Sequence, residues 1–293
     1  MRKFIKYIIV LASILVGSMY LLDSLYSWVY QNGAYRNKVM WIHDLKNENL
    51  DYIVFGSSRA NNYVIPNIIH EKTGKRGLNL AIQASGPLEI KVAIKEYLKH
   101  NYTERIFIQV DHSYNTEKPD KTGQLSWIPY MVDDEVYENF KPYGKEYQLF
   151  KYLPFYRYLM FDSRLGYRNV LLSSLNKGLD YSESKGYTES TGTLKKDEPY
   201  KFSLVDTPNS HFLEINKICN AINIEVIYFT SPIYRPEGNF EIISNHLPKY
   251  YNFSNVINDK KLFSDPSHVN KKGAKLFTEV FIDSFFNNKS TKE

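Results

Sequence analysis

The sequence predicts an α/β fold in which a mostly parallel sheet of about five strands lies between two layers of helices. Two observations predict it. Short apolar runs rich in β-branched and aromatic residues alternate with stretches of helical periodicity, and several of these runs end at Gly, Ser or Asp. Strands that alternate with helices form parallel βαβ units. An apolar segment near the N-terminus is long enough to add a membrane-spanning helix.

The first part of the chain contains three predicted strands with helices between them. The strands are residues 51–56, 76–81 and 105–110. The helices are residues 62–73 and 87–100. Residues 31–50 are polar, and we expect them to form a helix or a linker that leads away from the membrane.

The same alternation returns in the last third of the chain. The predicted elements are a helix at 210–222, strands at 224–229 and 253–257, and a final helix at 271–286. Together with the first part, they predict a flavodoxin-like three-layer α/β/α domain at residues 51–286, followed by a tail at 287–293.

Residues 113–200 interrupt this order, because they contain no clear βα unit. They are rich in aromatic side chains, in a chain that is 15% aromatic with 25 Tyr residues. A segment this long within a compact domain is usually functional, so we expect a lid or a binding insertion. Tyr suits carbohydrate or interfacial surfaces, although an AT-rich genome also enriches Tyr.

The N-terminal 30 residues have the pattern of a membrane anchor. Three cations precede an uncharged run at residues 7–22, and Tyr26, Trp28 and Tyr30 then supply an interfacial aromatic belt. The positive flank predicts a single-pass cell-membrane protein whose remaining chain lies on the extracytoplasmic side. The alternative is a cleaved signal peptide with small residues at 16–18, but the apolar run continues past them.

Composition argues against several other classes. The net charge of +5 is spread along the chain without a basic block, so we expect no nucleic-acid partner. The single Cys219 excludes an internal disulfide and a CxxC metal site. No set of His and Asp residues has metal-ligand spacing, so we expect neither a metal nor another cofactor.

Gly56-Ser57-Ser58-Arg59 directly follows the first predicted strand. A tight turn there presents the Ser58 hydroxyl at the carboxyl edge of the sheet, where open α/β folds place their sites. The start of the following helix favours developing negative charge. The alternative is an ordinary turn with an N-cap serine.

A second motif, Asp265-Pro266-Ser267-His268, precedes the final helix. The spacing of three residues puts Asp265 and His268 on one side of a turn. A nucleophilic serine needs a general base, and that base needs an orienting carboxylate. The alternative is an exposed pair in which Asp265 caps a helix.

Taken together, the two motifs resemble the first and last sequence blocks of the SGNH/GDSL hydrolase superfamily. The matching residues are Gly56, Ser58, Asp265, His268, Asn270 and Gly273. The resemblance covers roughly residues 50–112 and 210–286. Variants with Gly-Ser-Ser look like the membrane-anchored members that modify cell-envelope polymers, such as polysaccharide O-acetylation proteins and the D-alanyl-transfer protein of teichoic acid modification.

The resemblance implies roles and partners for this chain. Ser58 would be the nucleophile, His268 the base and Asp265 its orienting carboxylate. The substrate would be a polysaccharide or an acyl ester. A multi-pass O-acyltransferase would be a possible partner in the same membrane.

Two sequence blocks depart from the family pattern. The expected oxyanion-hole Gly falls near Ala84, so backbone N–H groups of Ala84, Ser85 or Gly86 are the candidate donors. The usual oxyanion Asn after the third strand is replaced, and Asn115 or Asn61 are candidate substitutes. The loss of one oxyanion donor lowers the rate by about 10²–10³-fold.

Three further polar residues are placed near the predicted site. Asp111 and His112 follow the third strand and either contact the substrate or acyl donor or cap a helix. Arg59 either binds an anionic substrate group or forms a structural ion pair. Arg235, in the loop after the fourth strand, has the character of a structural residue.

These features predict an extracytoplasmic serine-dependent esterase or O-acyltransferase that acts on a cell-envelope or capsular polysaccharide. A second hypothesis is a non-catalytic, membrane-tethered polysaccharide-binding or assembly protein that keeps the fold. A third is a lipid esterase whose aromatic insertion contacts the bilayer.

Overall fold

The computed structural model describes residues 1–195 and 197–287, which form two compact units. Unit 1 combines Met1–Met40 with Gln124–Leu179, and unit 2 combines Trp41–Gly123 with the chain from Asp180 onward. The predicted insertion at 113–200 is therefore divided: residues 124–179 belong to unit 1 and the remainder to unit 2. All of the predicted tail at 287–293 except Asn287 lies outside the described residues.

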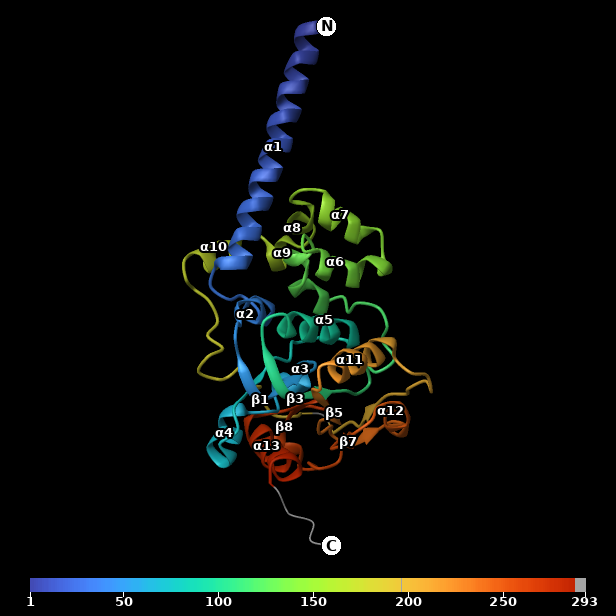
Figure 1. The fold of residues 1–293 in the computed structure, drawn as a ribbon. Helices are drawn as coiled ribbons and strands as arrows, with labels where there is room; N and C mark the ends of the chain where they lie inside the picture. The colour runs from blue at the N-terminus through green and yellow to red at the C-terminus, as the bar shows by residue number, and fades with distance from the viewer. Residues whose placement is uncertain (196, 288–293) are drawn as a thin grey trace. The chain divides into compact units, whose positions relative to one another are not determined.

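Unit 2 contains a five-stranded sheet with the order β2-β1-β3-β5-β7, in which each neighbouring pair is parallel (Figure 1). Its strands are β1 (Asn49–Phe55), β2 (Gly77–Asn79), β3 (Tyr102–Gln109), β5 (Glu225–Thr230) and β7 (Tyr250–Asn252). Two small sheets pair β4 (Tyr200–Lys201) with β6 (Pro236–Glu237) and β8 (Phe263–Asp265) with β9 (His268–Val269).

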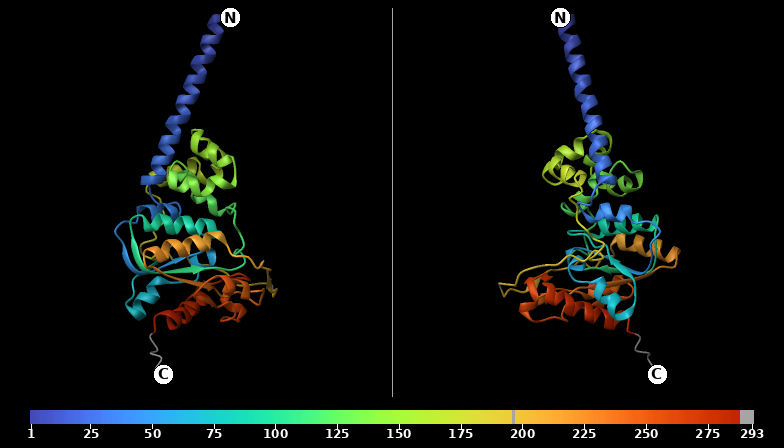
Figure 2. Two further views of the ribbon diagram at one scale, coloured as in Figure 1. Left: turned by 45° about the vertical axis from the view of Figure 1, so that its right-hand side comes forward. Right: turned by 90° about the vertical axis from the view of Figure 1, so that its left-hand side faces the viewer.

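Helices cover both faces of the five-stranded sheet (Figures 1 and 2). Helices α5 (Pro87–Leu98) and α11 (Ser210–Ala221) pack together on one face, and α4 (Pro66–Thr73) and α13 (Lys271–Phe285) pack on the other. The remaining short elements of unit 2 are α3 (Ser58–Asn61), α12 (Glu241–His246) and the 3₁₀ helix η4 (Lys260–Leu262). The predicted α/β fold with its parallel sheet is confirmed.

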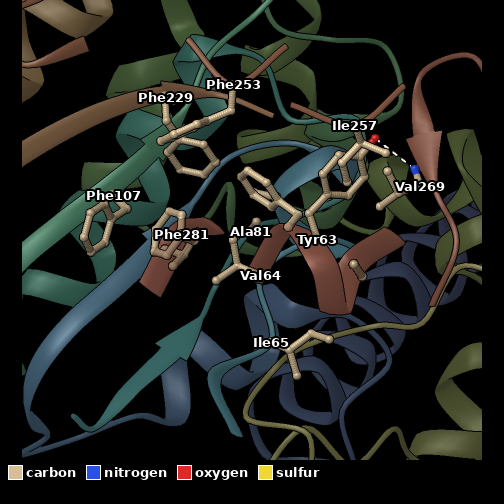
Figure 3. Packing of buried hydrophobic residues seen from close by; sticks show 14 of the residues in the cluster. Tyr63, Val64, Ile65, Ala81, Phe107, Phe229, Phe253, Ile257, Val269 and Phe281 are labelled. Carbon is tan, nitrogen blue, oxygen red and sulfur yellow. Dashed lines mark hydrogen bonds between the residues drawn. The ribbon is translucent and has the colours of Figure 1, made fainter. Parts of the chain in front are cut away.

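Aromatic side chains fill the layer between the sheet and α13 (Figure 3). Phe107 on β3 lies 4.7 Å from Phe281 on α13, and Phe229 on β5 lies 5.3 Å from the same ring, both measured between ring centroids. Burying one such ring is worth about 1.5–3 kcal/mol. The helix that follows the Asp265–His268 motif is thus fixed against the central strands.

The prediction that the last strand spans residues 253–257 is wrong. The strand is β7, and the chain turns at Phe253, whose N–H donates to Thr230 O at 3.0 Å. Phe253 and Ile257 are buried from this turn and belong to the core, which explains the apolar signal without a strand. A buried turn and a buried strand both need apolar residues, so a short apolar run does not distinguish between them.

Unit 1 consists of one long helix and a set of short ones. The long helix α1 (Arg2–Asn32) is, among the described residues, the one helix long and apolar enough to cross a membrane. The short α-helices are α6 (Asp134–Phe140), α7 (Glu146–Tyr152), α8 (Tyr156–Met160), α9 (Asp162–Leu165) and α10 (Tyr167–Ser174). The 3₁₀ helices are η2 (Ile128–Tyr130) and η3 (Lys141–Tyr143). Helix α2 (Lys38–Asp44) and the 3₁₀ helix η1 (Gly123–Ser126) cross the boundaries between the units.

A fully buried arginine joins the short helices of unit 1 to α1. Arg157 Nη1 lies 3.0 Å from Asp23 Oδ1, and Arg157 Nη2 donates to Ser27 Oγ at 2.8 Å. Asp23 also accepts a hydrogen bond from the backbone N–H of Phe155 at 2.8 Å. A buried cation is stable only when paired in this way, so this contact fixes α8 beside residues 23–27 of α1.

Candidate active site

The turn after β1 places Ser58 at the carboxyl edge of the sheet. Gly56 has a φ of +149°, and a Cβ there would approach Gln109 Cβ to 2.7 Å, so backbone conformation and space both require glycine. The turn is held from the neighbouring strand β3, because Gln109 Oε1 accepts hydrogen bonds from Ser57 N–H at 3.1 Å and from Ser57 Oγ at 2.7 Å. Ser58 then begins α3.

Ser58 lies next to His268, although 210 residues separate them in the sequence. Ser58 Oγ is 2.7 Å from His268 Nε2. On the other side of the ring, His268 Nδ1 is 2.9 Å from Asp265 Oδ2 and 3.0 Å from Asp265 Oδ1. The Nδ1–H tautomer satisfies both contacts and leaves Nε2 free to accept the serine proton.

A small antiparallel hairpin brings Asp265 and His268 together. They are directly opposed partners in the β8–β9 pair, with Pro266 and Ser267 forming the loop between them. Ser267 donates to Asp265 Oδ1 through its N–H at 2.8 Å and through its hydroxyl at 2.9 Å. The expectation that one turn holds both residues on the same side matches this hairpin.

The environment of Asp265 favours its ionised form. Partial burial alone would raise the pKa of this carboxyl, but the hydrogen bond and charge of His268, together with two bonds from Ser267, lower the pKa to about 2. Asp265 is therefore an anion at neutral pH. An anion at this place orients the imidazole and stabilises the imidazolium that forms when His268 takes a proton.

Tyr63 holds the hairpin against the segment that follows Ser58 (Figure 3). The buried Tyr63 hydroxyl accepts a hydrogen bond from Val269 N–H at 3.0 Å and donates to Ser267 O at 2.6 Å. Pro232 O lies 3.2 Å from the same hydroxyl. One side chain thus sets the position of the His268 backbone relative to Ser58, a role that sequence reasoning did not identify.

Asn270 and Gly273 support the hairpin from the start of α13. Asn270 is the N-cap, and its Oδ1 accepts from the N–H groups of Lys272 at 3.1 Å and Gly273 at 3.3 Å. A Cβ at Gly273 would collide with Leu262 O. These contacts give a structural reason for both residues in the Asp-x-x-His-x-Asn-x-x-Gly pattern.

The turn at residues 83–86 lies at the same edge of the sheet as Ser58. Ile82 N–H donates to Gly56 O at 3.0 Å, which fixes the start of this turn beside the β1 terminus. Two of the three candidate oxyanion donors are already engaged: Ser85 N–H donates to Ile82 O at 3.2 Å, and Gly86 N–H to Glu89 Oε2 at 2.9 Å.

Ala84 is the third candidate, and its backbone is in the left-handed region with a φ of +59°. Within residues 1–195 and 197–287, its N–H forms no intramolecular hydrogen bond. The N–H of Ser58 is the second free donor, because the first residues of a helix have no intrahelical acceptor. The candidate Asn115 is committed elsewhere, since its side chain bonds Val205 O at 2.9 Å and accepts from Val205 N–H at 2.8 Å.

A buried charge cluster adjoins Ser58. The guanidinium of Arg59 forms an ion pair with the fully buried Asp111, and Gln109 Nε2 donates to the same carboxylate. Burial would raise the pKa of Asp111, but the charge of Arg59 and the bonds from Arg59 and His112 hold it well below its usual range. The Arg59 side chain is thus in an ion pair, one of the two roles that its position in the sequence allowed.

His112 lies at the exposed side of this cluster. Its Nδ1 is 3.0 Å from Asp111 Oδ1 and 3.2 Å from both Arg59 Nη2 and the Tyr200 hydroxyl. The Tyr200 ring centroid is 5.7 Å from that of His112. Tyr200 comes from a segment with no predicted strand, so its approach to this edge could not be read from the sequence.

Arg235 forms an exposed ion pair with Asp197, with 3.2 Å between its Nη1 and Asp197 Oδ1. In the part of the chain that the structure describes, no group of three or more His, Cys, Asp or Glu side chains could hold a metal ion. No protein-family model matches the chain, and no curated protein matches it. The site geometry therefore carries the functional argument.

Proposed function

We propose that the protein is a serine-dependent acyl-ester hydrolase or O-acyltransferase with Ser58 as its nucleophile. The observation that carries this proposal is the continuous line of contacts from Ser58 Oγ to His268 Nε2 at 2.7 Å and from His268 Nδ1 to Asp265 at 2.9 Å. A structural serine needs no base held in this orientation. The same arrangement of nucleophile, base and carboxylate recurs on unrelated folds that perform acyl transfer.

The reaction proceeds in two steps. Ser58 Oγ attacks the ester carbonyl carbon while its proton passes to His268 Nε2, and the carbonyl oxygen becomes an oxyanion. The intermediate collapses as the C–O bond to the leaving alcohol breaks, and His268 returns the proton to that alcohol. An acceptor hydroxyl or water then gives its proton to His268 and attacks the acyl-Ser58 ester. As the bond from the acyl carbon to Ser58 Oγ breaks, His268 returns the proton to Ser58.

The N–H groups of Ser58 and Ala84 are the oxyanion donors in this proposal. Both lie at the carboxyl edge of the sheet, and neither has an acceptor within the described chain. Donors aimed at the developing charge act without reorganisation during the reaction, and each is worth about 10²–10³-fold in rate. The N–H groups of Ser85 and Gly86 are instead bonded to Ile82 O and to the Glu89 carboxylate.

The substrate class follows from the proposed membrane position and from the surface beside Ser58. Helix α1 carries its cations at its start, so α1 would anchor the chain with the site on the extracytoplasmic side. His112 and Tyr200 offer a polar aromatic surface next to the Arg59–Asp111 pair, of the kind that sugars contact. We therefore propose an envelope or capsular polysaccharide as substrate, with a multi-pass O-acyltransferase as partner.

A fluorophosphonate probe tests the nucleophile directly. The wild-type chain in detergent micelles is expected to form a covalent adduct, and Ser58→Ala is expected to form none. Ser244→Ala, which changes an exposed serine on α12, is the matched control and should label like the wild type. Equal labelling of Ser58→Ala and wild type, or no labelling of either, would show that Ser58 is not the nucleophile.

A cellular measurement tests the substrate class. Cells with Ser58→Ala are expected to lose ester-linked acyl groups from an envelope polysaccharide, and cells with Ser244→Ala to keep them. Unchanged acylation in Ser58→Ala cells, with polysaccharide binding retained, would favour the non-catalytic binding protein instead.

A further inference from the structure

Five exposed apolar side chains occupy a short stretch of unit 1 at α7 and α8. They are Leu149, Tyr152, Leu153, Leu159 and Met160, and we call them the apolar rim. Their exposed fractions range from 40% at Leu153 to 68% at Tyr152. An apolar group of this kind marks a surface that is covered by something else.

The exposure is concentrated in unit 1. In the described chain, residues 124–179 expose ten large apolar side chains, whereas the much longer unit 2 exposes seven. Single exposed apolar residues are normal on a soluble surface, so the seven in unit 2 need no explanation. The higher density of exposed apolar side chains at residues 124–179 does need an explanation.

The apolar rim lies beside a defined level of α1. The turn between α7 and α8 is tied to Asp23 through Phe155 N–H, and Arg157 on α8 pairs with the same carboxylate. The Tyr26 ring packs on Phe155 with 5.0 Å between centroids. Figures 1 and 2 show the N-terminal part of α1 extending beyond the short helices of unit 1.

Asp23 is the first charged residue after the apolar run of α1. The stretch Phe4–Leu22 is about 28 Å long at a rise of 1.5 Å per residue, and a hydrocarbon core is about 30 Å thick. If α1 spans the bilayer, Asp23 therefore emerges at its boundary. Leu153 is two residues from Phe155 and so lies within about 7 Å of this level, while the headgroup layer is about 5–8 Å deep on each side.

We infer that the apolar rim docks onto the bilayer, so that unit 1 binds the membrane interface in addition to carrying α1. This inference rests on the proposed span of α1 and is independent of the chemistry at Ser58. The occupant is the lipid headgroup and upper acyl region of the leaflet from which Asp23 emerges.

The polar residues around the rim fit this occupant. Three exposed cations, Arg164, Arg168 and Lys177, follow the rim in the sequence, and between Leu153 and Leu179 the one acidic residue is Asp162. Apolar side chains bordered by cations are typical of segments that lie in the interface of anionic membranes. The exposed Trp28 on α1 adds an aromatic side chain near the same level.

Site-directed spin labelling tests the inference on the full chain. Cys219, which is buried, is first replaced by Ala, and single cysteines are then introduced as Leu153→Cys and Met160→Cys. The protein is reconstituted into vesicles of phosphatidylcholine and phosphatidylglycerol. Collision rates of the nitroxide with oxygen and with a soluble nickel chelate then report its depth.

Two reference sites calibrate the measurement. Leu15→Cys lies within the apolar run of α1, and Glu138→Cys lies on α6 with an exposed side chain. We expect the labels at positions 153 and 160 to collide with oxygen more and with nickel less than the label at position 138. The label at position 15 should be the deepest.

If the labels at 153 and 160 are as exposed to nickel as the label at 138 while the label at 15 is buried, α1 spans the membrane and the rim does not dock. That outcome overturns the inference and leaves the rim to a protein partner. If the label at 15 is also exposed to nickel, the proposed span and the inference both fail. Fluorophosphonate labelling of Ser58 is read separately and depends on neither outcome.

Discussion

The hydroxyl of Tyr63 accepts a hydrogen bond from the backbone N–H of Val269, the residue after His268. The same hydroxyl donates to Ser267 O, so it bonds the chain on both sides of His268. Tyr63 itself lies five residues after Ser58. The distance between Ser58 and His268 is therefore set in part by one phenol, whose hydroxyl bonds the backbone on both sides of His268.

Tyr63→Phe should weaken both the hairpin and the reaction. The change leaves Val269 N–H and Ser267 O without this partner in a buried place, and each unsatisfied group costs about 1–3 kcal/mol. We expect a lower free energy of unfolding in urea and a lower kcat with a nearly unchanged KM. Tyr251→Phe, at a half-exposed position on β7, is the matched control. A kcat equal to that of wild type would show that Tyr63 does not position His268.

Asp265→Asn should remove the orienting anion while it keeps the size of the side chain. The neutral amide cannot stabilise the imidazolium, and its N–H₂ group can donate to His268 Nδ1 and so favour the wrong tautomer, so we expect a loss in kcat of about 10³–10⁴-fold. The carboxylate has a pKa lowered to about 2 by its bonds to His268 and Ser267. In the wild type, Asp265 should therefore stay ionised from about pH 4 upward.

The stability effect of Asp265 has a definite sign. A carboxyl whose folded pKa is lowered stabilises the fold above its unfolded pKa, and this contribution is lost as the pH falls through the folded value. The stabilisation is thus present above about pH 4 and disappears toward pH 2. Urea unfolding of wild type and Asp265→Asn should converge at the acid end. A difference between the two that stays constant from pH 6 to pH 2 would contradict this assignment.

Arg59 and Asp111 should behave as a coupled buried pair. Arg59→Met leaves the Asp111 carboxylate buried without its cation, and breaking a buried pair costs about 3–5 kcal/mol. The double variant Arg59→Met/Asp111→Asn removes both charges and should lose less stability than the single change. Urea unfolding of the two singles and the double gives the coupling free energy directly. Simple additivity of the two single effects would indicate that the pair is not a structural unit.

The fold and the two separate motifs around Ser58 and Asp265–His268 could be predicted because each has a local signal, whereas the joining of the motifs into one site was implied by the resemblance to a family. Strand-end glycine and serine, a three-residue Asp–His spacing and alternating periodicities are visible in short windows. Tyr63 and Gln109 were missed because their roles depend on contacts between distant segments. A buried tyrosine or glutamine looks the same in sequence whether or not its polar atom holds a turn such as those that carry Ser58 and His268.

The turn at residues 83–86 shows the same limit. Ala84, Ser85 and Gly86 are equivalent donors in sequence, and only the geometry shows that Ser85 and Gly86 are engaged. The strand predicted at 253–257 failed for a related reason, since a buried turn and a buried strand share an apolar pattern. Division of the 113–200 segment between two units depends on contacts with α1 that no local window contains.

Glu89 should make the stability of the protein depend on pH near neutrality. It is fully buried on α5 and accepts hydrogen bonds from Gly86 N–H at 2.9 Å and Asp120 N–H at 2.8 Å. Burial raises its pKa to about 7 against the opposing effect of these bonds. The folded chain therefore binds a proton between about pH 4.5 and pH 7 that the unfolded chain releases.

The sign of this effect is opposite to that of Asp265. Because the folded state binds more protons in this window, the free energy of unfolding should fall as the pH rises from 4.5 to 7, by about 3 kcal/mol in total, and then level off. Glu89→Gln cannot ionise and should lose this slope, which urea unfolding of the full chain in detergent micelles measures at each pH. The same slope in Glu89→Gln as in wild type would mean that another group binds the proton, and that Glu89 holds the Gly86 turn as an anion stabilised by its two N–H donors.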